Sequence, residues 1–280
     1  MRMREINIRN KEFIDLLNKL EVTITDWVEN RSDKLMELFH IHQNQQCPEA
    51  RERDNKVRMD HPGGASELYA AHDLYPPCGR EMLDLMIEKT KQHGPHAELT
   101  NGFPSRENLV AYRSIESQTW YDETKEPLEA AIKDISYKYL GGGSLALAAF
   151  YPPGGYIGWH HNGNAPGYNI LLHYNFGGTG NFYTFDNNEI IAYPDKPNEW
   201  VCRAGDFVIA HNDSRIDEIK QRGHRDFGSS IKGVLPRVAK DVEGMSWHSA
   251  ENPDTWRFTL STVINDFDIR EDLLDEIETP

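Results

Sequence analysis

Two histidines, far apart in the chain, form the pattern that could do chemistry. His160 ends the segment Y-P-P-G-G-Y-I-G-W-H-H-N, in which Gly154 and Gly155 hinge a predicted strand. His248 lies in W-H-S-A-E-N-P-D-T-W-R-F-T-L-S, nine residues before Arg257. Neutral imidazoles are common ligands of transition metals, and two that meet from distant strands can share one ion. The pattern therefore predicts a metal centre held by His160 and His248.

The strand that follows the second histidine predicts a partner for that metal. Alternation along W-R-F-T-L-S-T-V places Arg257, Thr259 and Ser261 on one face, with Phe258 and Leu260 on the other. An inward arginine and hydroxyl would be costly to bury without an anion to pair with. The far carboxylate of a dicarboxylate satisfies both, with the guanidinium bidentate and the hydroxyl as second donor. We therefore expect Arg257 and Thr259 to anchor a dicarboxylate.

The third ligand position departs from the expected pattern. Iron(II) that must also bind dioxygen and a bidentate keto acid can spare three positions, which two histidines and a carboxylate usually fill. The position for the carboxylate is Asn162. Asn162 could ligate through its amide oxygen, water could replace it with a more distant acid balancing the charge, or His161 could be the ligand with Gly163 at an open position. Strand alternation from Gly158 favours His160 over His161.

The stretch 143–264 resembles the 2-oxoglutarate/Fe(II)-dependent dioxygenase superfamily, and within it the prolyl-4-hydroxylase-like group. The matching residues are Tyr151 before P-P-G-G, His160 after G-W, the turn at Gly205 and Asp206, His248, and Arg257 with Thr259. The resemblance implies a hydroxylase that uses Fe(II), O2 and 2-oxoglutarate and releases succinate and CO2. It also implies that Tyr151 and His173 line the 2-oxoglutarate site, with no catalytic residue beyond the metal ligands.

Because the carboxylate is missing, other functions stay open. The main alternative is a catalytically impaired jelly-roll module with a binding or structural role. A further alternative is a halogenase-like variant with His161 as ligand, because an open coordination position resembles the halide-binding geometry of non-haem halogenases.

The elements that must position these residues change character near residue 140. Apolar residues at helical spacing predict helices behind Asn10 and Ser32, around Met82 and after Pro127. From Gly141 onward, short strands separated by turn residues are expected at 145–151, 155–160, 168–176, 181–186, 189–193, 199–203, 206–210 and 256–264. Glycines at 177, 178 and 180 predict one hairpin, and Asp186, Asn187 and Asn188 predict another.

This order predicts an α+β fold. We expect a double-stranded β-helix core, jelly-roll or cupin-like, at 141–280 and a mainly helical N-terminal extension at 1–140 packed on the sheet. Residues 47–75 are polar and predict a long loop. Residues 211–246 form a long, locally basic insertion, which is typical of a lid or binding loop but also of an ordinary solvated excursion. His211 is a rival second ligand, ranked below His248 because Lys220 in a polar stretch follows it.

Composition limits the partners and the compartment. The chain has 45 acidic and 30 basic residues among 280, so its formal charge of -15 disfavours binding to duplex nucleic acid. No apolar run reaches the length needed to span a membrane, and the polar start argues against a signal peptide. Cys47, Cys78 and Cys202 are widely spaced and predict a reducing compartment. We expect a cytoplasmic protein with a small-molecule or peptide substrate; the sequence does not predict its oligomeric state.

Overall fold

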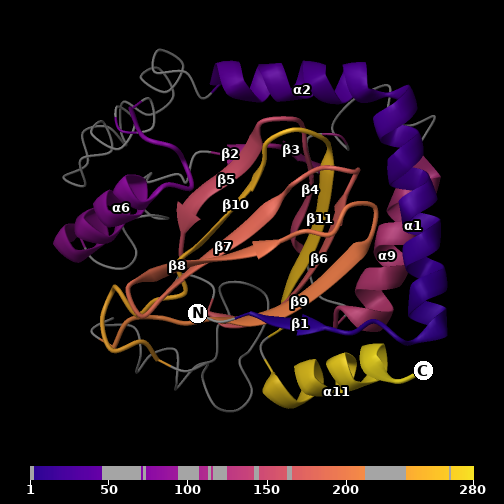
Figure 1. The fold of residues 1–280 in the computed structure, drawn as a ribbon. Helices are drawn as coiled ribbons and strands as arrows, with labels where there is room; N and C mark the ends of the chain where they lie inside the picture. Colours follow the sequence, from indigo (N-terminus) through magenta and orange to yellow (C-terminus); the bar gives the residue numbers. More distant parts are fainter. Residues whose placement is uncertain are drawn as a thin grey trace.

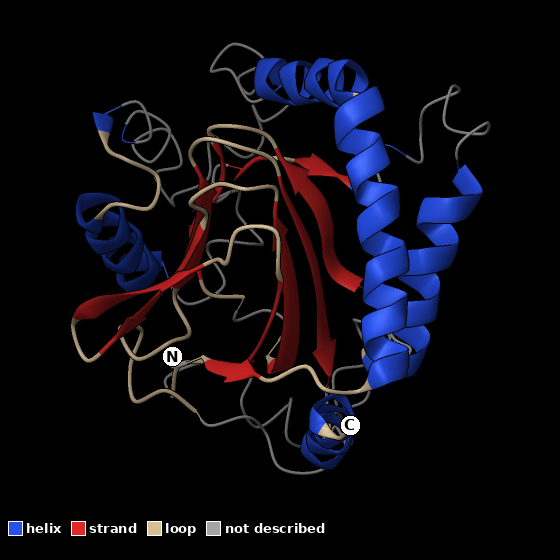
Figure 2. Cartoon of the chain, turned by 45° about the vertical axis from the view of Figure 1, so that its right-hand side comes forward, coloured by secondary structure: helices blue, strands red, loops and turns tan. Residues whose placement is uncertain are grey.

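Two antiparallel β-sheets lie face to face, with helices on their outer sides (Figure 1, Figure 2). The structure, a computed structural model, describes residues 3–45, 71, 74–93, 107–112, 115, 125–141, 145–162, 166–211, 238–264 and 266–280. Both sheets contribute to one buried cluster between them, which includes Tyr151 and Leu171 from one sheet and Phe182 and Ala250 from the other. The predicted mixture of helices with antiparallel sheets is confirmed.

The six-stranded sheet has the order β1 (Arg4–Ile6), β9 (Trp200–Phe207), β6 (Gly167–Asn175), β11 (Arg257–Ile264), β4 (Leu145–Tyr151) and β3 (Val110–Ala111). The five-stranded sheet has the order β2 (Glu107–Asn108), β5 (Gly155–His160), β10 (His248–Asn252), β7 (Asn181–Asp186) and β8 (Glu189–Pro194). From β4 to β11 the strands pair first with last: β4 with β11, β5 with β10, β6 with β9 and β7 with β8. This pairing brings β5 and β10 side by side although they are distant in the chain.

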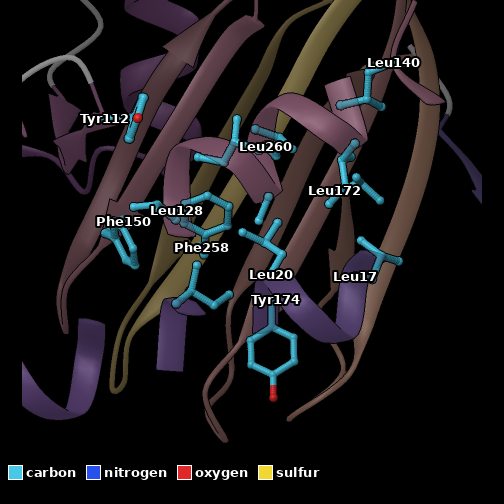
Figure 3. Close-up of a cluster of buried hydrophobic side chains, with 14 of the residues drawn as sticks. Leu17, Leu20, Tyr112, Leu128, Leu140, Phe150, Leu172, Tyr174, Phe258 and Leu260 are labelled. Atoms are coloured by element: carbon cyan, nitrogen blue, oxygen red, sulfur yellow. The ribbon is translucent and has the colours of Figure 1, made fainter. Parts of the chain in front are cut away.

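Two long helices, α1 (Lys11–Asn30) and α9 (Lys125–Tyr139), cover the outer face of the six-stranded sheet. The buried face of α1 repeats every three or four residues, at Phe13, Leu17, Leu20, Ile24 and Trp27. The Asn10 side chain caps this helix by accepting a hydrogen bond from the Phe13 N–H, at 3.0 Å. Figure 3 shows these helices packing their apolar side chains against those of the sheet.

The remaining helices surround the sheets at other sides (Figure 1). α2 (Ser32–Gln45) follows α1, and α6 (Arg80–His93) lies on the opposite side of the molecule, where Met82 and Met86 join a cluster with Trp159 and Trp247. α11 (Phe267–Glu278) begins at its cap Asp266. Among the helices in the described ranges, none is both long enough and apolar enough to cross a lipid bilayer.

Several predicted strands need correction. The strands predicted at 199–203 and 206–210 are the single strand β9, because Gly205 and Asp206 stay in its ladder with β6. β10 was not predicted, because its sequence H-S-A-E-N is polar and lacks apolar alternation. The glycines at 177, 178 and 180 do not form a hairpin, since they connect β6 to β7 in the other sheet.

Other predictions have mixed outcomes. The turn at Asn187 and Asn188 joins β7 to β8 as predicted, with φ of 51° and 66°. The boundary at residue 140 stays a prediction, and β1, β2 and β3 show that the first 140 residues contribute strands as well as helices. The loop predicted at 47–75 and the insertion at 211–246 lie mostly outside the described residues.

Candidate metal centre and buried arginine cluster

His160 and His248 meet across the five-stranded sheet. His160 is the last residue of β5 and His248 is the first of β10, and the ladder pairs them directly. Their ring centroids are 4.0 Å apart, and both side chains are buried. The register of β10 against β5 shifts just after His248, an irregularity of the kind that redirects a side chain. The structure thus brings together the two histidines that the sequence singled out.

The same local contact orients both rings. His160 donates from Nδ1 to the Gly158 carbonyl at 2.8 Å, and His248 donates from Nδ1 to the Ser246 carbonyl at 2.6 Å. A carbonyl can only accept, so both rings carry a proton on Nδ1. Burial, followed by the neighbouring His160, lowers the pKa of His248 well below its usual 6.5. The low pKa favours the neutral form of His248, which is the form in which a histidine binds a metal.

Asn162 reaches the same place. Its φ of 50° lies in the left-handed region that asparagine tolerates, and its amide Nδ2 donates to His248 Nε2 at 3.2 Å. A half-turn of the amide exchanges its nitrogen and oxygen, so the same side chain could offer an oxygen there. Among the described residues, no three His, Cys, Asp or Glu side chains gather into a metal-binding group. The donor set available to a divalent transition metal is therefore two imidazoles and one amide.

The rival histidines lie elsewhere. His161 is buried against the edge of Trp247, at a ring distance of 4.7 Å, whereas His160 is the one opposite His248. His211 is exposed, just after the bridge between Ala210 and Ala239. Trp159 and Trp247 pack in the hydrophobic cluster beside α6.

Arg257 lies inside the sandwich, but its main partner corrects the reasoning from the sequence. The side chain is fully buried on β11, between β4 and β6, rather than on an exposed edge. Its Nε donates to Asp195 Oδ2 at 2.6 Å, so the chain itself supplies the anion that we expected only from a ligand. Burial of Arg257 therefore does not by itself require a dicarboxylate.

Asp195 is shared between two arginines. Arg203, also buried, donates from Nη1 to Asp195 Oδ1 at 3.0 Å and from Nη2 to the Pro194 carbonyl at 2.6 Å. Burial alone would raise the pKa of Asp195, but the charges of Arg257 and Arg203 outweigh it and hold that pKa well below its usual range. Two guanidiniums with one carboxylate leave this cluster with one positive charge in excess.

His173 completes the cluster. Its Nδ1 lies 3.0 Å from Arg257 Nη2 and 3.2 Å from the Thr259 hydroxyl. A guanidinium can only donate, so Nδ1 accepts and the ring proton is on Nε2. Burial, followed by the charge of Arg257, lowers the pKa of His173 well below 6.5, which keeps the ring neutral. Among the described residues, His173 Nε2, Arg257 Nη1 and Arg203 Nε have no hydrogen-bond partner, although all three are buried.

Aromatic side chains connect this cluster with the paired histidines. The centroid of the Phe182 ring lies 6.0 Å from that of His173 and 5.7 Å from that of His248. Phe207 stacks on His248 at 5.0 Å. Tyr151, paired with Arg257 in the ladder, has its ring 5.1 Å from the guanidinium. All seven residues predicted for the site therefore lie in or beside one interior region between the sheets.

Two residues of this region were missed from the sequence. Asp195 follows β8 in Y-P-D-K-P-N, a composition typical of a turn, and no pattern there indicates an inward carboxylate. Arg203 could have been found: in V-C-R-A-G it alternates with Cys202 and Ala204, which pack toward the helices, so it must point inward.

Comparison with known proteins gives little further information. No protein-family model and no curated protein matches this chain. Among solved structures, a match is described as a predicted oxalate decarboxylase from Thermotoga maritima; it is 16% identical, covers 47% of this chain and 74% of its own, and has a TM-score of 0.21. A likeness this slight carries no argument about activity.

Proposed function

We propose that this protein is an Fe(II)- and 2-oxoglutarate-dependent oxygenase of the prolyl-4-hydroxylase-like group. The observation that carries the proposal is the direct pairing of His160 with His248, each with Nδ1 donating to a backbone carbonyl so that Nε2 is the nitrogen left to face a metal. Support also comes from the excess positive charge in the same interior region, and from donors of Arg257 and His173 that no described residue binds. A buried donor without a partner is costly and calls for an explanation, of which a bound anion is one.

The strand pairing supports the proposed core. The eight strands from β4 to β11 pair the first with the last, the second with the second-last, and so on to β7 with β8. They thus form one long hairpin that folds into two sheets, a connectivity typical of a double-stranded β-helix. In such a fold β5 and β10 are neighbours of necessity. His160 at the end of β5 and His248 at the start of β10 can therefore bind one metal ion.

The residues have separate roles in this proposal. His160 and His248 hold the metal through Nε2, and the third position belongs to the Asn162 amide oxygen or to water. Iron(II) with 2-oxoglutarate supplies the oxidation: one atom of O2 enters a substrate C–H bond as hydroxyl, and the other enters succinate as CO2 leaves. Arg257 and His173 orient the keto acid by its far carboxylate, with Thr259 and Tyr151 beside them. Phe182 and Phe207 pack around His248 and keep its Nε2 away from bulk water.

The first experiment measures metal binding and cosubstrate binding apart from turnover. Protein reconstituted anaerobically with Mn(II) is titrated with 2-oxoglutarate, and the wild type is compared with His248→Ala. We expect one metal ion per chain in the wild type, loss of metal in the variant, and 2-oxoglutarate binding that strengthens when the metal is present. Iron-dependent formation of succinate, with a gain of one oxygen in a substrate mixture analysed by mass spectrometry, then tests the reaction. Absence of metal binding in the wild type would exclude the oxygenase.

A specific contact favours a second candidate function. The Asn162 amide donates to His248 Nε2, so in this arrangement the nitrogen needed by a metal is already occupied. A module that binds a carboxylate ligand without metal chemistry would keep the arginine cluster and this amide contact. Binding of 2-oxoglutarate that is the same with and without Mn(II) would favour the binding module. The halogenase-like variant is not proposed, because it requires His161 in the place where the structure has His160.

Substrate and compartment remain proposals. The substrate class we propose is a small molecule or a peptide, and a cytoplasmic location fits the cysteine pattern. Of the three cysteines, Cys78 and Cys202 are described, and both are buried as free thiols.

A further inference from the structure

We propose that Asp195 determines ligand specificity, by limiting the anion that the buried arginine cluster accepts to a single negative charge. The cluster consists of Arg203, Arg257, Asp195 and His173. On this basis it accepts a carboxylate and rejects a dianionic phosphate group. The identification of the carboxylate as that of 2-oxoglutarate rests on the proposed function, whereas the charge preference is a property of the cluster alone.

The contacts of Arg257 leave one nitrogen for a ligand. Nε is bound to Asp195 at 2.6 Å and Nη2 to His173 Nδ1 at 3.0 Å, and Nη1 has no partner in the part of the chain that the structure describes. On the neighbouring ring, His173 Nε2 carries a proton and likewise has no partner within the described ranges. A carboxylate would therefore receive one hydrogen bond from each of these two side chains, rather than the bidentate pair from Arg257 that the sequence suggested.

Asp195 cannot easily move away from the arginines. Its backbone N–H donates to the Gly180 carbonyl at 2.9 Å, and its two carboxylate oxygens bind different guanidiniums. Gly180 is packed so closely that a Cβ there would lie 2.5 Å from Asp195 Oδ2. The carboxylate is thus held in place from three directions, and its negative charge is a permanent part of the cluster.

Charge balance gives the specificity. The two guanidiniums and the Asp195 carboxylate sum to one positive charge, with His173 neutral, so a carboxylate ligand makes the buried region neutral. A phosphate dianion would instead leave a net negative charge beside the fixed carboxylate of Asp195, in a region shielded from water. Buried charges without a counterion are strongly disfavoured. Asp195→Asn raises the charge of the cluster by one and should admit the dianion.

The test uses metal-free protein and two small probes of similar size, propionate and ethyl phosphate, at pH 8, where the phosphate is mainly dianionic. Binding is followed by calorimetry and by the imidazole NMR signals of His173. For the wild type we expect propionate to bind at least about tenfold more tightly than ethyl phosphate. In Asp195→Asn this preference should fall by at least about tenfold. Asp206→Asn is the matched control, because it removes the carboxylate of another aspartate–arginine pair, with Arg270, and should leave the preference unchanged.

Further variants keep the test decisive if Asp195→Asn does not fold. Arg203→Gln lowers the charge of the cluster to zero and should weaken the binding of propionate. The double variant Asp195→Asn with Arg203→Gln restores one positive charge and should restore the preference for propionate over ethyl phosphate. The inference would be overturned if Asp195→Asn left the ratio of the two dissociation constants unchanged, for example by weakening the binding of both probes equally. It would also be overturned if the wild type showed no saturable binding of propionate. Failure of Mn(II) to strengthen 2-oxoglutarate binding counts against the proposed function alone, because the two probes require no metal.

Discussion

Removal of Asp195 should cost more stability than removal of either arginine that it binds. Asp195→Ala leaves two buried guanidiniums without their counterion, whereas Arg257→Met leaves Asp195 still bound to Arg203. Loss of one partner of a buried ion pair typically costs about 3–5 kcal/mol. Because two cations lose their partner here, we expect about 5 kcal/mol for Asp195→Ala and a smaller loss for Arg257→Met.

This free energy can be expressed as a melting temperature. Unfolding entropies of about 2.1 cal/mol/K per residue give roughly 0.6 kcal/mol/K for a chain of this length. The Asp195→Ala variant should therefore melt about 8 °C below the wild type at pH 7. Differential scanning calorimetry or circular dichroism measures the shift, and urea titration checks that the transition stays cooperative.

The same variant makes a prediction about pH. The folded-state pKa of Asp195 lies below its value in the unfolded chain, which is about 3.9. The stability that it contributes is present above the unfolded pKa and is lost as pH falls toward the folded pKa. The wild type loses this contribution in acid and Asp195→Ala does not, so the gap in melting temperature should narrow below about pH 4. The reasoning would be refuted if the difference in melting temperature between the wild type and Asp195→Ala stayed constant from neutral pH to pH 3, or if Arg257→Met lost more stability than Asp195→Ala. Asp206→Asn again serves as the control.

Three further substitutions test other parts of the structure. Asn162→Asp should raise Mn(II) affinity by about tenfold or more in equilibrium dialysis, because a direct ligand should matter at least as much as its supporting contacts; unchanged affinity would remove position 162 from the metal site. Gly180→Ala places a methyl group 2.5 Å from both Asn175 Nδ2 and Asp195 Oδ2 and should destabilise the fold by about 1–3 kcal/mol in urea; a neutral result would mean that the close packing can relax. Asn10→Ala removes the cap of α1 and should cost about 1 kcal/mol, with Asn10→Asp largely retaining stability.

The helices and most strands could be predicted because each has a local cause. The apolar spacing of α1 and its Asn10 cap are both visible in the sequence, and so are the two asparagines of the hairpin between β7 and β8. β10 could not be predicted, because a short strand that is paired on both sides can be polar when its ladder and its buried histidine hold it in place. The glycines before β7 predict a turn but not which sheet the next strand joins.

For the site, the sequence by itself determined which side chains with useful chemistry point inward. His160, His173 and Arg257 were selected because strand alternation is a local property of the backbone. Tertiary structure alone decided their partners: it set His248 opposite His160, turned the Asn162 amide onto His248, and provided Asp195 as the counterion of Arg257. These contacts join residues that are far apart in the chain, and they depend on which strands become neighbours when the long hairpin folds into two sheets.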